Sequence, residues 1–194
     1  MRRFLGVCAF GIALGLGNAH AETPLPKGWS LAGSNPASYT VQLDGELKKA
    51  GMQSARLEAP NKTEGFGTLM QSILADPYRG KRLQLSAFIK TSEVLEHAGL
   101  WMRVDGPSHI VVLDNMNDRP ITGTIGWNKF KVVLDVPANA SAIAFGVLLD
   151  GAGKVWIDDV NLSVVGDDVP VTASPRLRGA QELVASPTNL DFEI

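Results

Sequence analysis

A period-two alternation of apolar and polar residues is the feature that most constrains what this chain can fold into. The alternation recurs in Leu83–Lys90, Leu100–Asp105, Lys129–Val136, Ile143–Leu149 and Val155–Val164. A period of two places alternate side chains on opposite faces of a strand, so each stretch is predicted to be a strand with one face on a core. In the last stretch the apolar face changes phase at Asp158-Asp159, which predicts a β-bulge.

Weaker strand patterns and turn residues fill most of the remaining middle of the chain. Further strands are expected at Tyr39–Asp44, Ser54–Ala59, Gly67–Leu74 and His109–Asp114. Turns are expected at Arg79-Gly80, Asp105-Gly106-Pro107 and Asp150-Gly151. Only Ser92–His97 has the composition of a helical turn. Many short strands without a sustained helical pattern indicate an all-β fold, a jelly-roll β-sandwich of two antiparallel sheets.

The first 21 residues have the layout of a removable export signal. Arg2 and Arg3 precede an apolar run, Phe4–Leu16, and small residues flank His20 in Ala19–Ala21. The run is shorter than the roughly 20 apolar residues that span a bilayer, although a retained anchor is the alternative. Cleavage before Glu22 predicts a periplasmic or secreted protein with no membrane span. The single cysteine, Cys8, would leave with the signal, so no disulfide is expected.

Composition and turn residues divide the rest of the chain into a lead-in and one domain. Residues 22–36 are rich in Pro, Gly and Ser and are expected to be irregular, and residues 37–194 are expected to form a single domain. That domain would include a loop at 166–187 and a terminal strand at 189–194. The chain has a formal net charge of −2 and no basic cluster. Nucleic acid is therefore not an expected partner, because such binding depends on neutralising phosphates with Lys and Arg.

Several segments resemble the galactose-binding-like jelly rolls of many carbohydrate-binding modules. Lys154–Leu162 is similar to their final strand, and Gly65–Gln71 and Gly99–Gly106 are similar to the middle of a bacterial set that occurs alone or beside peptidase or regulator domains. Such modules often open with Asn-x-x-Phe-Glu and then Gly-Trp. Here Gly28-Trp29 lies near the start, but Asn189–Glu193 lies at the end. The resemblance, over residues 28–194, implies a sandwich in which a C-terminal strand replaces the usual N-terminal edge strand.

A candidate ligand site follows from the strand faces that point away from the core. Sugar binding calls for a flat aromatic ring beside planar hydrogen-bonding groups. The candidate residues are Trp101, Arg103 and Asp105 on one strand face, Phe88 and Lys90 on another, and Asn115 and Trp127 from loops. The alternative is structural, with Trp101 packed under a covering loop and Arg103 paired with an acid.

The acids of two motifs form a candidate metal site. Hard carboxylate oxygens suit calcium. The resemblance implies a structural Ca²⁺ between Asp159 and Glu193, with Asp158 beside them. The alternative is that one acid points to solvent and the other caps a backbone turn.

Three function classes remain open at this point. The leading hypothesis is an exported, non-catalytic binding module for a glycan or small polyol. The second is a structural or protein-interaction module of the cell envelope. The third is a small glycosidase or esterase, for which Asp105 and Asp114 could be written as a pair. A monomer is expected, and the long loop before residue 189 would also permit a strand-swapped dimer.

Overall fold

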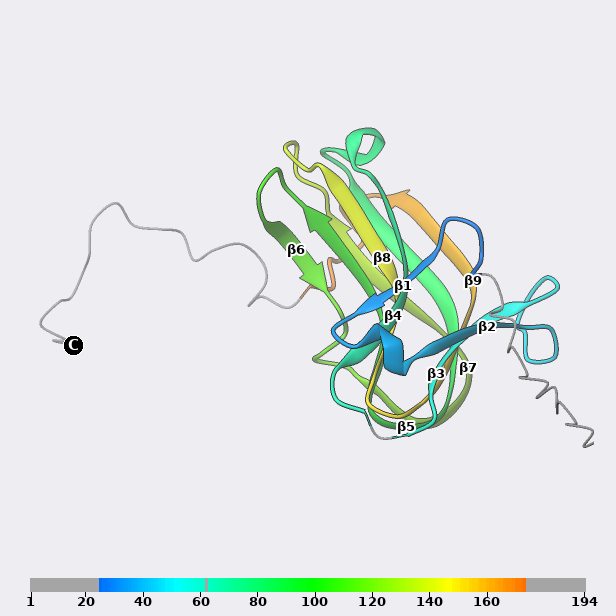
Figure 1. Ribbon diagram of the computed structural model, residues 1–194. Coiled ribbons are helices and arrows are strands. Elements are labelled where there is room, and N and C mark those ends of the chain that lie inside the picture. The colour runs from blue at the N-terminus through cyan, green and yellow to red at the C-terminus, as the bar shows by residue number, and fades with distance from the viewer. Residues whose placement is uncertain (1–24, 62, 174–194) are drawn as a thin grey trace, which may run out of the picture.

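The computed structural model describes residues 25–61 and 63–173, and strands make up most of them (Figure 1). The strands of these residues are β1 (Ser30–Gly33), β2 (Thr40–Asp44), β3 (Ser54–Ala59), β4 (Phe66–Leu74), β5 (Arg82–Asp105), β6 (Ile110–Asp114), β7 (Ile121–Asp135), β8 (Ala142–Asp150) and β9 (Gly153–Val165). Two short 3₁₀ helices, η1 (Pro36–Ser38) and η2 (Asp76–Tyr78), precede β2 and β5. Within the described ranges, no helix is long and apolar enough to cross a membrane.

The long strand β5 belongs to two sheets. Its first part, from Arg82, pairs with β7 on one side and β9 on the other. Its last part, from His97 to Asp105, pairs with β8 and β6. The strands therefore form a β8 sheet, in the order β1-β4-β8-β5-β6, and a β9 sheet, in the order β2-β3-β9-β5-β7. Every one of these pairings is antiparallel.

One apolar core fills the space between the two sheets. Alternate residues of each strand contribute to it, as the sequence periodicity predicts. Its larger, fully buried side chains are Leu57, Leu69, Leu83, Leu85, Ile89, Leu100, Met102, Val104, Val132, Leu134, Ile143 and Leu149. The all-β jelly-roll sandwich is thus confirmed, and burying about a dozen such side chains is the main favourable contribution to its stability.

The bulge in β9 is confirmed at the expected place. Three residues of β5, from Ser86 to Phe88, are matched by four of β9, from Asn161 to Asp158. Asp159 lies in the bulge with a φ of 49°. A bulge changes the direction of the side chains on the longer strand, so β9 keeps an apolar inner face on both sides of it.

Two segments differ from the sequence prediction. Ser92–His97 was expected as a helical turn, but it lies inside β5, where the register with β7 shifts repeatedly and Glu93 has a φ of 54°. Here pairing between strands overrides a local preference, because Leu95 donates its N–H to Ala152 of the β8–β9 turn. Within the supposedly irregular lead-in, Ser30–Gly33 forms β1 and pairs with β4.

Some expectations concern residues outside the described ranges. They are the export signal at 1–21, most of the loop at 166–187 and the terminal strand at 189–194 with its role as an edge strand. The described start of the loop packs against β7, where Thr172 donates its N–H to Val133 and the side chain of Ala173 is buried in the core.

Candidate functional site

A hollow of about 320 Å³ lies on the outer face of the β8 sheet. It is lined by Ala32, Gly33, Phe66, Thr68, Met70, Trp101, Arg103, Ile110, Leu113, Asn115 and Leu148. Most of these residues occupy strand positions that alternate with core positions, so they face away from the core. The volume lies at the lower end of the range for small-molecule sites, and a mostly apolar lining with a few polar groups is typical of them.

Trp101 forms the floor of this hollow. Its neighbour on β8 is Gly146, whose neighbour on β4 is Met70. Since Gly146 has no side chain, the indole extends across β8, and its Nε1 donates a hydrogen bond to Oγ1 of Thr68 at 2.8 Å. A Cβ at position 146 would lie 2.1 Å from the carbonyl oxygen of Leu69. The close approach of β4 therefore requires glycine here.

Trp101 is more buried than an aromatic ring that offers its whole face to a sugar. The side chain lies off the main core, as its strand parity indicates, but only 7% of it is exposed. It packs in a separate apolar cluster with Ala144 and Leu148, against Met70 and Leu113. The alternation along the strand correctly predicts which face of the sheet Trp101 lies on. The exposed fraction of its side chain depends on residues of the neighbouring strands.

Arg103 and Asp105 form an ion pair beside the hollow. Nε of Arg103 lies 2.9 Å from Oδ1 of Asp105, and Nη2 lies 2.9 Å from Oδ2. The pairing matches the structural alternative for Arg103. In the described residues Nη1 of Arg103 has no hydrogen-bond partner, and the side chain still lines the hollow. A half-exposed planar donor is thus held in a fixed orientation by a carboxylate.

Asn115 adds a second polar group at the end of β6. Its Oδ1 accepts the N–H of Asn117 at 3.4 Å, while its amide nitrogen has no partner among the residues described. With Arg103 it places hydrogen-bond donors above an apolar floor. A ligand with an apolar face and a rim of hydroxyl groups would match this arrangement.

The other candidate ligand residues lie on the opposite side of the sandwich. Phe88 and Lys90 belong to the part of β5 in the β9 sheet, and Trp127 lies in β7 of the same sheet. Trp156 of β9 lies opposite Lys90 and is 4% exposed. Sequence reasoning did not select Trp156, although it alternates with the core residues Val155 and Ile157 just as Trp101 alternates with its neighbours.

Around the candidate metal residues, the bulge of β9 contacts the β2–β3 loop. Oδ2 of Asp158 accepts the N–H groups of Lys49 and Ala50, at 2.6 and 2.9 Å, and Oδ1 accepts the N–H of Asp159 at 2.7 Å. These contacts hold the β2–β3 loop against β9. No group of three His, Cys, Asp or Glu in the described part of the chain could hold a metal ion. Glu193 lies outside that part, so the calcium site stays a prediction.

Asp105 and Asp114, the two acids that a hydrolytic function would use, face different ways. Asp114 pairs in register with the core residue Met102, whereas Asp105 pairs with Arg103 on the outer face. Asp114 is buried, and its carboxylate accepts hydrogen bonds from Arg119, Thr172 and the N–H of Met116. The two carboxylates do not flank a common cleft, as a two-carboxylate glycosidase requires.

A second cavity, of about 430 Å³, opens between the two sheets near the bulge. Trp29 and Phe145, whose rings are 6.1 Å apart in an edge-to-face arrangement, form part of its wall. Gln71, Ser54 and Asp159 contribute polar groups. Sequence reasoning missed this cavity because its lining comes from segments distant in sequence, and the apolar members, such as Leu69 and Phe145, read as core.

No protein-family model matches the chain. A curated relative, described as an uncharacterized HTH-type transcriptional regulator YbfP from Bacillus subtilis (strain 168), is 46% identical over 170 residues. The alignment covers 86% of this chain and 57% of the relative, so the chain spans just over half the length of that protein.

Solved structures with a similar fold include carbohydrate-binding modules. The CBM22-1 xylan-binding domain of Paenibacillus barcinonensis Xyn10C superposes with a TM-score of 0.53 at 18% identity, covering 74% of this chain and 90% of that domain. A family 16 carbohydrate-binding module gives a TM-score of 0.52 at 16% identity, covering 68% and 92%. The enzymatically active domain of tailspike protein 4 from bacteriophage CBA120 gives 0.57 at 18% identity, covering 72% and 20%. The chain therefore has the jelly-roll β-sandwich fold of carbohydrate-binding modules, as the sequence resemblance implied.

Proposed function

We propose that this chain is a non-catalytic binding module that holds a glycan in the hollow on the outer face of the β8 sheet. The observation that carries the proposal is the convergence of Arg103 and Asn115 above the apolar floor formed by Trp101. The fold shared with xylan-binding and other carbohydrate-binding modules supports it. We further propose that the module acts in the periplasm or outside the cell, because its first 21 residues have the pattern of an export signal.

A glycan array probed with the purified protein identifies the ligand class, and titration calorimetry with xylohexaose tests the xylan case directly. We expect Arg103→Lys to weaken binding about ten-fold, which is about 1.4 kcal/mol. Lysine keeps the charge but loses the planar fork that fits paired hydroxyl oxygens. Asn115→Ala is expected to weaken binding by a similar factor, because the amide is a donor that has no partner elsewhere in the described residues.

Arg79→Lys is the matched control. Arg79 is also a half-exposed arginine paired with an aspartate, Asp76, at 3.2 Å, but it lies at η2 and away from the hollow. Its replacement should leave glycan binding unchanged. Equal binding by Arg103→Lys and the parent protein would reject the hollow as the site.

The burial of Trp101 favours one other function. A floor residue that is 7% exposed fits a sheet face on which a protein partner packs, as in a structural or interaction module of the envelope. No binding to any glycan on the array, together with a loss of partner recruitment in Leu113→Asp, would support that function instead.

A further inference from the structure

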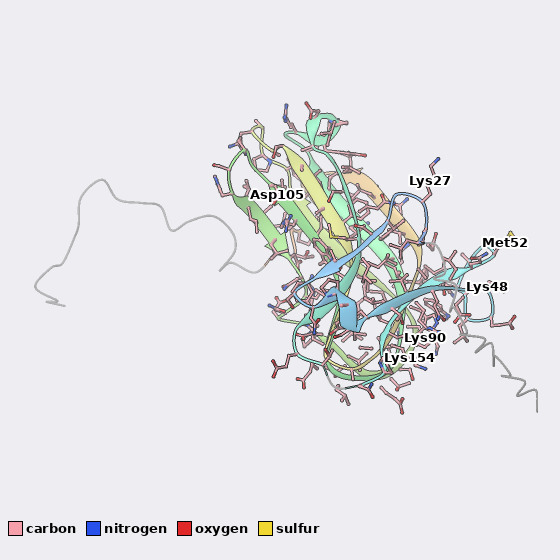
Figure 2. The ribbon with its side chains drawn as sticks, viewed as in Figure 1. Lys27, Lys48, Met52, Lys90, Asp105 and Lys154 are labelled. Carbon is pink, nitrogen blue, oxygen red and sulfur yellow. The ribbon has the colours of Figure 1, made fainter. Side chains whose placement is uncertain are left out.

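The β2–β3 loop, residues 45–53, projects from the β9 sheet and carries exposed apolar side chains. Met52 is 83% exposed and Leu47 is 42% exposed. Figure 2 shows Met52 and Lys48 at the end of the projecting hairpin, far from Asp105 beside the hollow. Such a large fraction of an apolar side chain in water is unfavourable, so this tip is a candidate contact surface.

The loop is held in this shape by contacts with buried or half-buried groups. Oδ1 of Asp44 accepts the N–H groups of Glu46 and Leu47 at 3.0 and 2.9 Å. Oδ2 of Asp158 accepts those of Lys49 and Ala50. Two carboxylate oxygens thus hold four backbone N–H groups of the loop. The exposed position of the tip follows from these hydrogen bonds.

The turn before Met52 also helps to hold the tip in its exposed position. Gly51 has a φ of 60°, a conformation that favours glycine, and it directs the following residue away from the sheet. Ser54 then returns the chain by donating its Oγ to the carbonyl oxygen of Leu47 at 2.5 Å. The fold therefore presents Met52 on a constrained turn.

Lysine side chains surround the base of this loop. Nζ of Lys49 lies 4.9 Å from the ring centroid of Phe88, and Nζ of Lys129 lies 5.6 Å from the same centroid. Lys90 lies over the ring of Trp156, at 5.9 Å. The aromatic rings hold the lysine stems along the sheet while the ammonium groups remain near the surface.

These three lysines have no acidic partner in the part of the chain that the structure describes. Lys154, by contrast, lies 3.8 Å from the carboxylate of Glu58. The loop itself contributes one acid, Glu46, against two lysines. The carboxylates of Asp44 and Asp158 at the base of the loop accept backbone N–H groups, so the ammonium groups of the three lysines stay available beside the apolar tip. In Figure 2, Lys90 and Lys154 lie on the same side of the molecule as Lys48.

We propose that this surface, comprising the tip residues Leu47 and Met52 and the lysines Lys49, Lys90 and Lys129, docks on an anionic lipid bilayer. A polyanion in solution would be bound by the lysines alone and would leave Met52 in water. A bilayer takes up both groups, because apolar side chains enter the interface while cations lie among anionic headgroups. Docking through this surface leaves the hollow on the β8 sheet accessible, so the inference is independent of the glycan proposal.

Vesicle flotation with protein isolated from its host tests this inference. The probes are phosphatidylcholine vesicles and vesicles in which one lipid in three is phosphatidylglycerol. We expect binding to the anionic vesicles that decreases with salt, and little binding to the neutral ones. Met52→Glu should lower the partition coefficient roughly ten-fold, since it removes an inserted apolar side chain. Lys90→Gln and Lys129→Gln should each lower it about five-fold.

Matched controls come from the opposite sheet and from η2. Leu74, at the end of β4, is 72% exposed, so Leu74→Glu makes the same chemical change away from the tip. Lys81, whose Nζ donates to the carbonyl oxygen of Pro77, provides Lys81→Gln. Neither control should change vesicle binding. All variants have the same N-terminal segment, so any vesicle binding by that segment is the same in each. Differences among the variants therefore come from the substituted positions.

Two outcomes would overturn the proposal. One is equal partition of Met52→Glu and the parent protein on anionic vesicles. The other is binding to soluble dextran sulfate that needs Lys90 and Lys129 but not Met52, with no binding to vesicles, which would indicate a polyanion as the partner.

Discussion

The two outer faces of the sandwich share one structural feature but present different chemical groups to the solvent. On each face a buried tryptophan extends across one strand and donates its indole N–H to a group on the next. Trp101 crosses β8 to reach Thr68, and Trp156 crosses β3 to reach Asp44 at 2.9 Å. The difference lies in the residue that each ring crosses.

On the β8 sheet the crossed residue is Gly146, and on the β9 sheet it is Arg56. Glycine lets the indole of Trp101 lie across β8, where it forms the floor of the hollow. Arg56 instead carries a long side chain at the corresponding position, opposite Trp156, and pairs with Glu58 at 3.2 Å. One face is therefore suited to hold a small ligand, while the other carries charged side chains and a projecting loop (Figure 2) and is suited to contact a surface. The residue that each indole crosses, more than the aromatic ring itself, therefore decides what a sheet face can bind.

Truncation of either tryptophan is expected to have the largest effect. Both side chains are more than nine-tenths buried, so Trp101→Ala and Trp156→Ala should each cost about 3 kcal/mol of unfolding free energy. That loss corresponds to a decrease in Tm of roughly 10 °C in a domain of this size. Thermal unfolding followed by near-ultraviolet circular dichroism measures both. A Tm of Trp101→Ala within a degree of the parent would show that the ring is not packed as described.

A side chain added beneath the indole of Trp101 is the next largest change. Gly146→Ala adds a Cβ that would lie 2.1 Å from the carbonyl oxygen of Leu69, and backbone must move to accept it. We expect a cost of about 1–3 kcal/mol, typical of overpacking, and loss of ligand binding in the hollow. Urea unfolding and the glycan titration measure these two effects. The control is Gly126→Ala, at a position where an added Cβ meets nothing.

Trp101 and Gly146 also show which features could be predicted from the sequence alone. The period-two pattern predicts the strands, their inner faces and the bulge at Asp158-Asp159, because those properties depend on residues that are adjacent in the chain. It also places Trp101, Arg103 and Asp105 on one face. The hollow could not be predicted, since it depends on Gly146 lying opposite Trp101, and that register is set by pairing between strands distant in sequence.

The predicted ligand residues lie on opposite faces of the sandwich because of strand pairing that the sequence does not show. The segment with Phe88 and Lys90 and the segment with Trp101 read as two separate strands. In the structure they are one strand, β5, that passes from the β9 sheet to the β8 sheet through an irregular stretch at Ser92–His97. Their off-core faces consequently point to opposite sides of the molecule.

The two indole hydrogen bonds are expected to differ in strength. Trp101→Phe removes a bond to the neutral Thr68 hydroxyl and should cost about 0.5–1 kcal/mol, whereas Trp156→Phe removes a bond to the Asp44 carboxylate and should cost about 1–2 kcal/mol. Urea unfolding at pH 7 measures both. Equal costs would mean that the charge of Asp44 does not strengthen its bond to the indole.

The pH dependence sharpens the same comparison. The hydrogen bond from the N–H of Leu47, together with that from Trp156, lowers the pKa of Asp44 below its ordinary 3.8. Stabilisation from a lowered carboxyl pKa is present above the unfolded value and is lost as the pH falls through the folded one. The extra cost of Trp156→Phe should therefore shrink below pH 3.8, while that of Trp101→Phe should stay constant.

The smallest effect is expected at His97, where β5 passes between the two sheets. Burial lowers the pKa of its imidazole below the ordinary 6.5, against the opposing influence of the Asp150 carboxylate and a hydrogen bond with the backbone of Asn115. Its Nε2 is buried and has no partner among the described residues. A buried neutral imidazole binds its proton less readily in the folded protein than in the unfolded chain.

The sign of the pH effect follows from this difference. Below about pH 6.5 the unfolded chain takes up a proton that the folded protein refuses, so stability decreases as the pH falls toward the folded pKa. One proton limits the slope to about 1.4 kcal/mol per pH unit. His97→Gln should remove this decrease in Tm between pH 7 and pH 5, because glutamine does not titrate. His109→Gln, at an exposed turn position, serves as the control and should retain the parent slope. If His97→Gln kept the same decrease in Tm, another group would have to be responsible, and the junction between the two sheets would not be sensitive to protonation.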